Sequence, residues 1–154
     1  MSRYLCFLIL IVLTLVLISG CNDVNPITNT EIDWEPTQHN IVNTLKDVSM
    51  LVREGTVSPV GLTIVLKNDS NVEYTYGRAY SIEKNIEGKW YQVPTIRELE
   101  VPADELILLP SDSNEMDITW DYYYGKLDDG KYRLIIKIDP YILAAEFEIS
   151  SRNN

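Results

Sequence analysis

The chain has 154 residues, 45% of them hydrophobic, with 13 Lys and Arg against 23 Asp and Glu and a formal net charge of −10 at pH 7. This length supports one domain with a hydrophobic core and is too short for two once an N-terminal export segment is set aside. The acidic balance disfavours nucleic acid and anionic lipid headgroups as partners and favours cationic ones, because like charges repel.

The first 20 residues have the pattern of an export signal. Met1-Ser2-Arg3 is a short positive start, and residues 4–18 are an uncharged apolar run. This run is shorter than the about 20 residues of a membrane-spanning helix, so residues 1–20 are predicted to be a signal peptide. The alternative is an uncleaved N-terminal membrane helix, which would leave the rest of the chain on the same side of the membrane.

The apolar run ends in small residues followed by a cysteine. The five positions are Leu17, Ile18, Ser19, Gly20 and Cys21. They resemble the lipobox of bacterial lipoproteins. The resemblance implies that Cys21 is lipidated on its thiol with a chain such as palmitate, becomes the mature N-terminus and anchors the protein to the extracytoplasmic face of the cell membrane. Two or more acyl chains hold a protein stably, whereas one binds only marginally.

Cys6 and Cys21 are the only cysteines. The first lies in the segment expected to be removed and the second is expected to be lipidated, so no disulfide is available to the mature domain. Without residues 1–20 the chain carries 12 Lys and Arg against 23 Asp and Glu, a net charge of −11.

Residues 21–45 are predicted to be the lipidated N-terminus and a tether. They are polar, contain two prolines and show no sustained periodicity. A flexible chain of about 23 residues would have a root-mean-square reach of roughly 25 to 30 Å. Ile32 and Trp34 favour a second interpretation, in which part of the tether docks on the domain as an extra strand.

Residues 46–150 are a succession of short alternating runs with turn residues between them, and no convincing helical stripe is present. The apolar faces are Val48, Met50, Val52; Leu62, Ile64, Leu66; Met116, Ile118, Trp120; and Ala145, Phe147, Ile149. Residues 68–71 suit an Asx-type turn. Residues 74–83 are predicted to be a less regular strand, and residues 85–88 to close a hairpin onto 89–93. Within residues 94–110 the apolar stretch 106–109 suits either an edge strand or a loop.

The longest strand is predicted at residues 130–138. Tyr132, Leu134, Ile136 and Ile138 fall on one face, and Lys131, Arg133 and Lys137 fall on the other. This is the pattern of a half-buried antiparallel strand. The preceding Asp128-x-Gly130-x-Tyr132 has the spacing of a tyrosine corner, in which the Tyr hydroxyl bonds back to nearby backbone.

About seven or eight one-faced strands bury their apolar faces best as two packed antiparallel sheets. The sequence therefore predicts an all-β chain with an immunoglobulin-like antiparallel β-sandwich over residues 46–150 and a disordered tail at 151–154.

Turn and core residues support this fold. They are Ser58-Pro59-Val60-Gly61-Leu62-Thr63, Asn68, Tyr76-Gly77, Ile82-Glu83-Lys84, Gly88-Lys89-Trp90-Tyr91 and Gly130-Lys131-Tyr132-Arg133. In this order, over about residues 47–150, they resemble the bacterial immunoglobulin-like domain family found in Gram-positive lipoproteins. The resemblance implies a fold and a cellular location, and it implies no particular activity.

Catalytic groups are scarce. The only histidine, His39, lies in the predicted tether and is expected to be solvated. The domain therefore lacks the histidine that a hydrolytic triad needs beside its nucleophile. The many carboxylates could supply a glycosidase-like pair, but they are better explained as solvated turn and edge charges. Residues 112–117 resemble a calcium loop, yet Met116 and Asp117 stand at a ligand position and at the required glycine. We therefore expect an acidic loop there and no enzyme activity, metal or cofactor.

Residues 120–125 read Trp-Asp-Tyr-Tyr-Tyr-Gly, and adjacent aromatic side chains cannot all point inward. Tyr123 and Tyr124 are predicted to be more exposed than Trp120 and Tyr122 and to form a candidate binding patch. The alternative is that Tyr123 and Tyr124 line the turn under the corner. Trp90 is expected in the sandwich core.

The sequence thus favours a membrane-anchored, non-catalytic binding module whose partner is an unknown protein or cell-wall component. The alternative is an exported protease-inhibitor-like β-sandwich, for which only residues 94–110 could supply the long exposed loop. A third class is an enzyme of unrecognised type.

Overall fold

The computed structural model describes residues 34–98, 100 and 103–151. The predicted signal peptide, the lipobox, Cys21 and residues 152–154 lie outside the described residues. In the part of the chain that is described, no helix is both long and apolar enough to cross a membrane.

The described residues form strands and one single-turn helix. In chain order these are β1 (Val48–Val52), β2 (Gly61–Asn68), β3 (Tyr74–Gly77), β4 (Tyr80–Ile86), β5 (Lys89–Gln92), β6 (Glu105–Leu108), β7 (Asp112–Thr119), α2 (Asp121–Tyr124), β8 (Gly130–Ile138) and β9 (Tyr141–Ile149).

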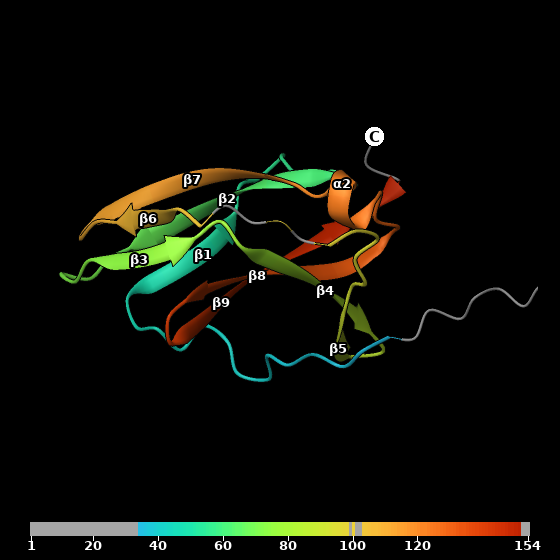
Figure 1. Ribbon diagram of the computed structural model, residues 1–154, viewed down its shortest axis with the longest axis horizontal. Coiled ribbons are helices and arrows are strands. Elements are labelled where there is room, and N and C mark those ends of the chain that lie inside the picture. The colour runs from blue at the N-terminus through green and yellow to red at the C-terminus, as the bar shows by residue number, and fades with distance from the viewer. Residues whose placement is uncertain (1–33, 99, 101–102, 152–154) are drawn as a thin grey trace, which may run out of the picture. The chain divides into compact units, whose positions relative to one another are not determined.

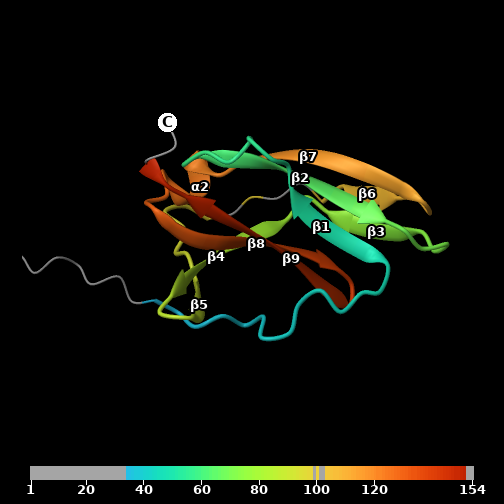
Figure 2. The ribbon, with the colours of Figure 1, turned by 180° about the vertical axis from the view of Figure 1, so that it is seen from behind.

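The strands pack as two antiparallel layers, seen from opposite sides in Figures 1 and 2. One layer has the strand order β1-β2-β7 and the other β5-β4-β8-β9, while β3 pairs with β6. The chain leaves β3 at Gly77 and enters β4 at Tyr80, which carries it toward the second layer. β1 lies beside β9, so the layers also approach each other at that side. The predicted all-β sandwich is confirmed.

The core lies between the two layers and contains the predicted apolar faces. Ile64, Leu66, Leu134 and Leu143 are fully buried. Each of the apolar faces predicted from the sequence contributes buried side chains to this core. The Phe147 ring lies with its centre 5.5 Å from the Trp120 ring centre and 5.6 Å from the Tyr132 ring centre. Burial of such aromatic side chains contributes most to the hydrophobic stabilisation of a small domain.

The predicted tyrosine corner is present at the start of β8. The Tyr132 hydroxyl donates to the Asp128 carbonyl oxygen at 2.9 Å. The side chain is buried, so this bond satisfies a polar group that would otherwise lose its water partner without compensation.

Two predicted turns are also confirmed. Asn68 Oδ1 accepts from the Ser70 backbone N–H at 3.0 Å, the bond of an Asx turn, and its amide nitrogen donates to the Leu109 carbonyl oxygen at 3.0 Å. In the β4–β5 hairpin, Glu87 and Gly88 have φ of 52° and 84°. Positive φ at both central residues is what the preferred two-residue hairpin turn requires.

The structure shows which parts of the segment from residue 94 to residue 117 are strands. Residues 105–108 form a strand, β6, rather than a loop. Residues 112–119 form β7, so the expected acidic loop is wrong and the calcium-loop alternative fails as well. The reason is pairing with β2 along eight residues, which places Glu115 beside Arg53 and Asp117 beside Thr63 on the outer face. Within the described residues, no group of three or more His, Cys, Asp or Glu side chains could hold a metal ion.

Candidate functional site

The aromatic run after β7 forms one helical turn instead of continuing as a strand. The Tyr124 N–H donates to the Trp120 carbonyl oxygen at 2.8 Å, and the Gly125 N–H donates to that of Asp121 at 2.9 Å. Residues four apart on a helix lie on the same side, so Trp120 and Tyr124 both face the core. Tyr122 points outward with 59% of its surface exposed, whereas Tyr124 is only 7% exposed.

The candidate patch of Tyr123 and Tyr124 is therefore corrected. Tyr124 is a core residue and Tyr123 is half-buried, while Tyr122, expected to be buried, is the most exposed of the three. The prediction failed because it extended the period-2 alternation of β7 through residues that adopt the period of a helix.

Tyr122 belongs to an exposed surface that we call the Tyr122 patch, formed by Ile96, Arg97 and Tyr122. The Arg97 guanidinium carbon lies 4.3 Å from the centre of the Tyr122 ring, and Ile96 is 64% exposed. Such a cation–π contact holds an arginine in one place over an aromatic face. The sequence showed Ile96 only as one apolar residue in an irregular polar segment, and nothing local placed it beside Tyr122.

Tyr123 positions the loop that carries this patch. Its carbonyl oxygen accepts from the Ile96 N–H at 2.8 Å, and its hydroxyl donates to the Glu100 carbonyl oxygen at 3.0 Å. The loop is thus attached to α2 at two points. Tyr123 acts within the domain, and the neighbouring residues carry the exposed surface.

Tyr80 lies beneath α2 and is perturbed by it. Its hydroxyl donates to the Thr119 carbonyl oxygen at 2.9 Å, and its ring centre is 6.2 Å from that of Tyr124. Burial, followed by the nearby Tyr124, Tyr123 and Asp121, raises the pKa of Tyr80 to about 12. Burial also raises the pKa of Tyr124. Both phenols therefore stay neutral at any physiological pH.

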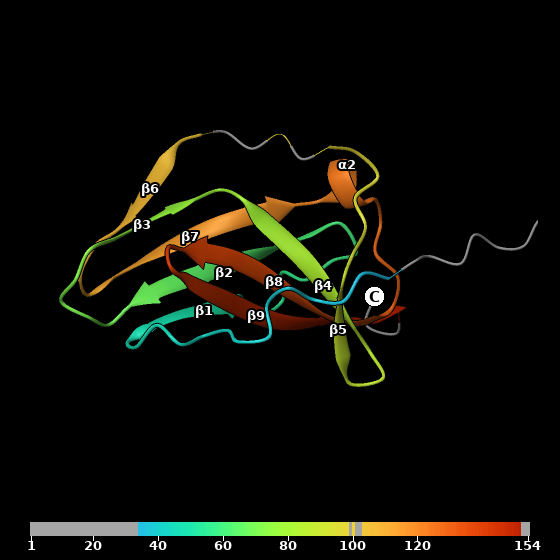
Figure 3. The ribbon, with the colours of Figure 1, turned by 60° about the horizontal axis from the view of Figure 1, so that its bottom comes forward.

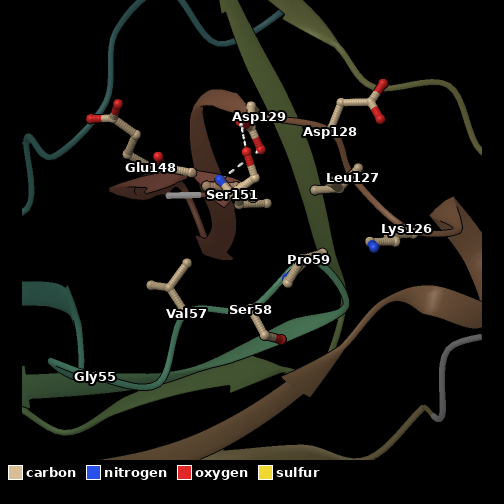
Figure 4. A pocket seen from close by; sticks show the side chains of 12 residues that line it. Gly55, Val57, Ser58, Pro59, Lys126, Leu127, Asp128, Asp129, Glu148 and Ser151 are labelled. Atoms are coloured by element: carbon tan, nitrogen blue, oxygen red, sulfur yellow. Dashed lines mark hydrogen bonds between the residues drawn. The ribbon is translucent and has the colours of Figure 1, made fainter. Parts of the chain in front are cut away.

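A cleft of about 670 Å³ lies beside the tyrosine corner, between the turn at 55–59 and the end of β9 (Figure 4). Asp129 turns toward Ser151 and accepts from its N–H at 3.0 Å and from its hydroxyl at 2.7 Å, while Asp128 points away. The Ser58 hydroxyl donates to the Gly61 carbonyl oxygen at 2.9 Å. These groups tie loops together, and the described residues of the lining include no histidine or cysteine that could activate a hydroxyl.

Residues 34–43, which we call the strap, cross the outward face of the sheet that contains β5, β4, β8 and β9 (Figure 3). At one end the Gln92 N–H donates to the Glu35 carbonyl oxygen at 2.8 Å. At the other, the Asn43 carboxamide accepts from the Ala144 N–H at 2.8 Å and donates to its carbonyl oxygen at 3.0 Å. The described part of the predicted tether is thus docked on the domain, the second interpretation that Trp34 favoured.

An ion pair lies under the strap. Arg133 Nε donates to Glu83 Oε2 at 2.7 Å, and the two residues are 5% and 0% exposed. The Thr37 hydroxyl donates to Glu83 Oε1 at 2.6 Å, and Arg133 Nη2 donates to the His39 carbonyl oxygen at 2.9 Å. The strap therefore supplies hydrogen-bond partners to both charges.

Three sequence expectations change at this place. Arg133 is buried rather than solvent-facing, and so is Ile135 on the same side of β8. Trp90 lies half-buried outside the core, with the Arg133 guanidinium carbon 4.5 Å from its ring centre. His39 is half-buried in the strap rather than solvated. The burial of Arg133 and His39 follows from the strap, which adds a further layer to a face that alternation alone assigns to solvent. Trp90 lies on that outward face because the β4–β5 register pairs it with Asn85.

A family model described as a bacterial Ig-like domain matches residues 44–148. No curated protein matches the chain at a significant level, and no solved structure does.

Proposed function

The chain belongs to the bacterial Ig-like domain family, and we propose that it is an interaction module. We further propose, from the N-terminal sequence, that it is lipid-anchored on the extracytoplasmic face of the cell membrane. Domains of this family are typically non-catalytic. The proposed anchor is Cys21, supported by the positive start, the apolar run and the lipobox residues 17–20.

The mass of the mature protein tests the anchor. Cys21→Ser removes the thiol on which lipid transfer and the following cleavage depend, so the precursor is expected to keep residues 1–20. Cys6→Ser is the matched control, because this cysteine lies in the segment that is removed and its change should leave processing intact. A wild-type protein without acyl mass, or with an N-terminus other than Cys21, would refute the anchor.

The partner, an unidentified protein or cell-wall component, is proposed to bind the Tyr122 patch. The observation that carries this proposal is the exposure of Ile96 and Tyr122, two large side chains. Arg97 lies over the Tyr122 ring, and the Ile96 N–H is bonded to the Tyr123 carbonyl oxygen. Rigid aromatic and aliphatic groups offer contact area at low entropic cost, and arginine is enriched at such contacts. The net charge favours a partner with cationic groups around the contact.

Binding is tested with the double variant Ile96→Ser/Tyr122→Ser in the full-length lipoprotein. It should fold as the wild type does, yet lose both crosslinks to its partner on intact cells and retention on purified cell wall. Leu51→Ser is the control, because Leu51 is 57% exposed on β1 and outside the patch. If the double variant and the control bind equally well, the patch is not the binding surface, whatever the result for Cys21.

The protease-inhibitor alternative gains no support from the segment it requires. Residues 105–108 are paired with β3, and Ile96 is bonded to α2, so neither part is a free loop able to enter a protease cleft.

A further inference from the structure

A second cleft lies between the strap and the β4–β5 hairpin, on the side of the domain formed by Trp90 and Arg133. Its volume is about 530 Å³, within the range of about 300 to 1,000 Å³ of small-molecule sites. The described residues that line it include His39, Lys89 and Arg133 and no aspartate or glutamate.

Arg133 has hydrogen-bond donors left over in this cleft. Its Nε donates to Glu83, and its Nη2 contacts the same Glu83 oxygen and donates to Thr37 and His39. Its Nη1 has no hydrogen-bond partner among the described residues. Every fully buried side-chain nitrogen or oxygen in the described chain does have a partner, so Nη1 is not completely buried. The side chain is only 6% exposed, and the strap cleft is the opening that it lines. A nearly buried guanidinium thus presents one amino group to the cleft.

The charges of the lining suit a ligand with one negative charge. Glu83 is fully buried against Arg133 and neutralises it, which leaves Lys89 as the uncompensated cation among the described residues of the lining. A single carboxylate balances this charge, whereas a phosphate dianion would exceed it. Trp90 adds aromatic surface on which an apolar part or a sugar ring can pack.

We propose that this strap cleft binds a small organic carboxylate, which accepts hydrogen bonds from Arg133 Nη1 and Lys89 Nζ and packs on Trp90. Such a ligand would contact the strap and the hairpin together and would therefore hold the strap closed on the sheet. The carboxylate could belong to an acidic sugar or to the C-terminus of a peptide, which share this chemistry. The site is separate from the Tyr122 patch and from Cys21.

Ligand-observed NMR and thermal unfolding of the full-length protein in detergent micelles test the proposal. The acidic probes are D-glucuronate and N-acetyl-L-alanine, and the matched neutral probes are D-glucose and N-acetyl-L-alanine amide. We expect an acidic probe to bind, to shift the indole resonance of Trp90 and to raise the unfolding temperature. The neutral probes should do none of these. Which acid binds more tightly identifies the acidic sugar or the peptide C-terminus as the source.

Substitution of the exposed lysine separates the site from general charge attraction. Lys89→Gln should weaken binding of the acidic probe by about three- to tenfold, as expected for the loss of one partly exposed charge contact. Lys67→Gln, which removes an exposed lysine from the other sheet, should leave binding unchanged. The proposal is overturned if no acidic probe binds, if neutral and acidic probes bind alike, if inorganic phosphate binds more tightly than both acids, or if the two lysine variants behave alike.

Discussion

Arg133 and Glu83 form an ion pair on the face of their sheet that points away from the hydrophobic core, with Arg133 Nε 2.7 Å from Glu83 Oε2. An ion pair on such a face would ordinarily be solvated and contribute little to stability. Here the strap covers it, and removing a partner from a buried charge is costly. The strap and the pair therefore depend on each other.

Thr37→Val should open the strap. Valine has nearly the shape of threonine but lacks the hydroxyl that donates to Glu83 and accepts from the His39 N–H at 2.8 Å. We expect a loss of about 1 to 3 kcal/mol in the free energy of unfolding, because buried polar groups are left without partners. Hydrogen exchange should quicken across residues 35–43 while β8 remains protected.

Thr63→Val provides the control for this change. The Thr63 hydroxyl donates to Asp117 at 2.7 Å on an exposed face, where water can replace the lost bond. Equal losses for Thr37→Val and Thr63→Val would show that the strap does not bury the ion pair in solution.

Tyr132→Phe should lower the free energy of unfolding by about 1 to 3 kcal/mol, because the Asp128 carbonyl oxygen loses its bond inside the domain. The denaturant midpoint should fall with an unchanged m-value. Tyr122→Phe, which removes an exposed hydroxyl, should stay within about 0.5 kcal/mol of the wild type. A midpoint for Tyr132→Phe equal to that of Tyr122→Phe would contradict the tyrosine corner.

Tyr124→Ser should lower the free energy of unfolding more than Tyr122→Ser does, which is the reverse of what the alternation in the sequence predicts. Tyr124 is buried, so its truncation should cost about 3 kcal/mol or more, as for other large-to-small core changes. Tyr122→Ser should change stability by no more than about 0.5 kcal/mol. Thermal unfolding of the two variants decides the matter, and a destabilised Tyr122→Ser with an unaffected Tyr124→Ser would reverse the orientation of α2.

Alkaline pH should destabilise the fold partly through Tyr80. Its pKa rises from 10.0 to about 12 on folding, so the folded state holds this proton more tightly than the unfolded state. The stabilising contribution is complete below about pH 10 and is lost as the pH rises toward about 12. In Tyr80→Phe the free energy of unfolding should start lower, because the bond to Thr119 is gone, and should fall less steeply over this interval. An unchanged slope would show that Tyr80 is not perturbed by folding.

Features with local causes were predictable. The Asx turn at Asn68 needs only a side chain that bonds to backbone two residues on, and the β4–β5 turn needs residues that tolerate positive φ. The corner at Tyr132 spans four residues. Helix α2 was missed because four residues with adjacent aromatics satisfy a strand end and a helical turn equally well. The helix is selected by the bonds from the Tyr124 N–H to Trp120 and from the Gly125 N–H to Asp121.

Sequence by itself determined the inward face of the sandwich, because a period-2 alternation assigns each side chain to a face of its strand before any packing is known. The outward face was decided only by the tertiary structure. Thr37 reaches Glu83 across 46 residues and Arg133 across 96, and no pattern within a strand encodes a segment that returns from so far to cover it. Burial of a charge depends on everything that packs around it, which is why Arg133 has the sequence pattern of a surface residue and the environment of a buried one.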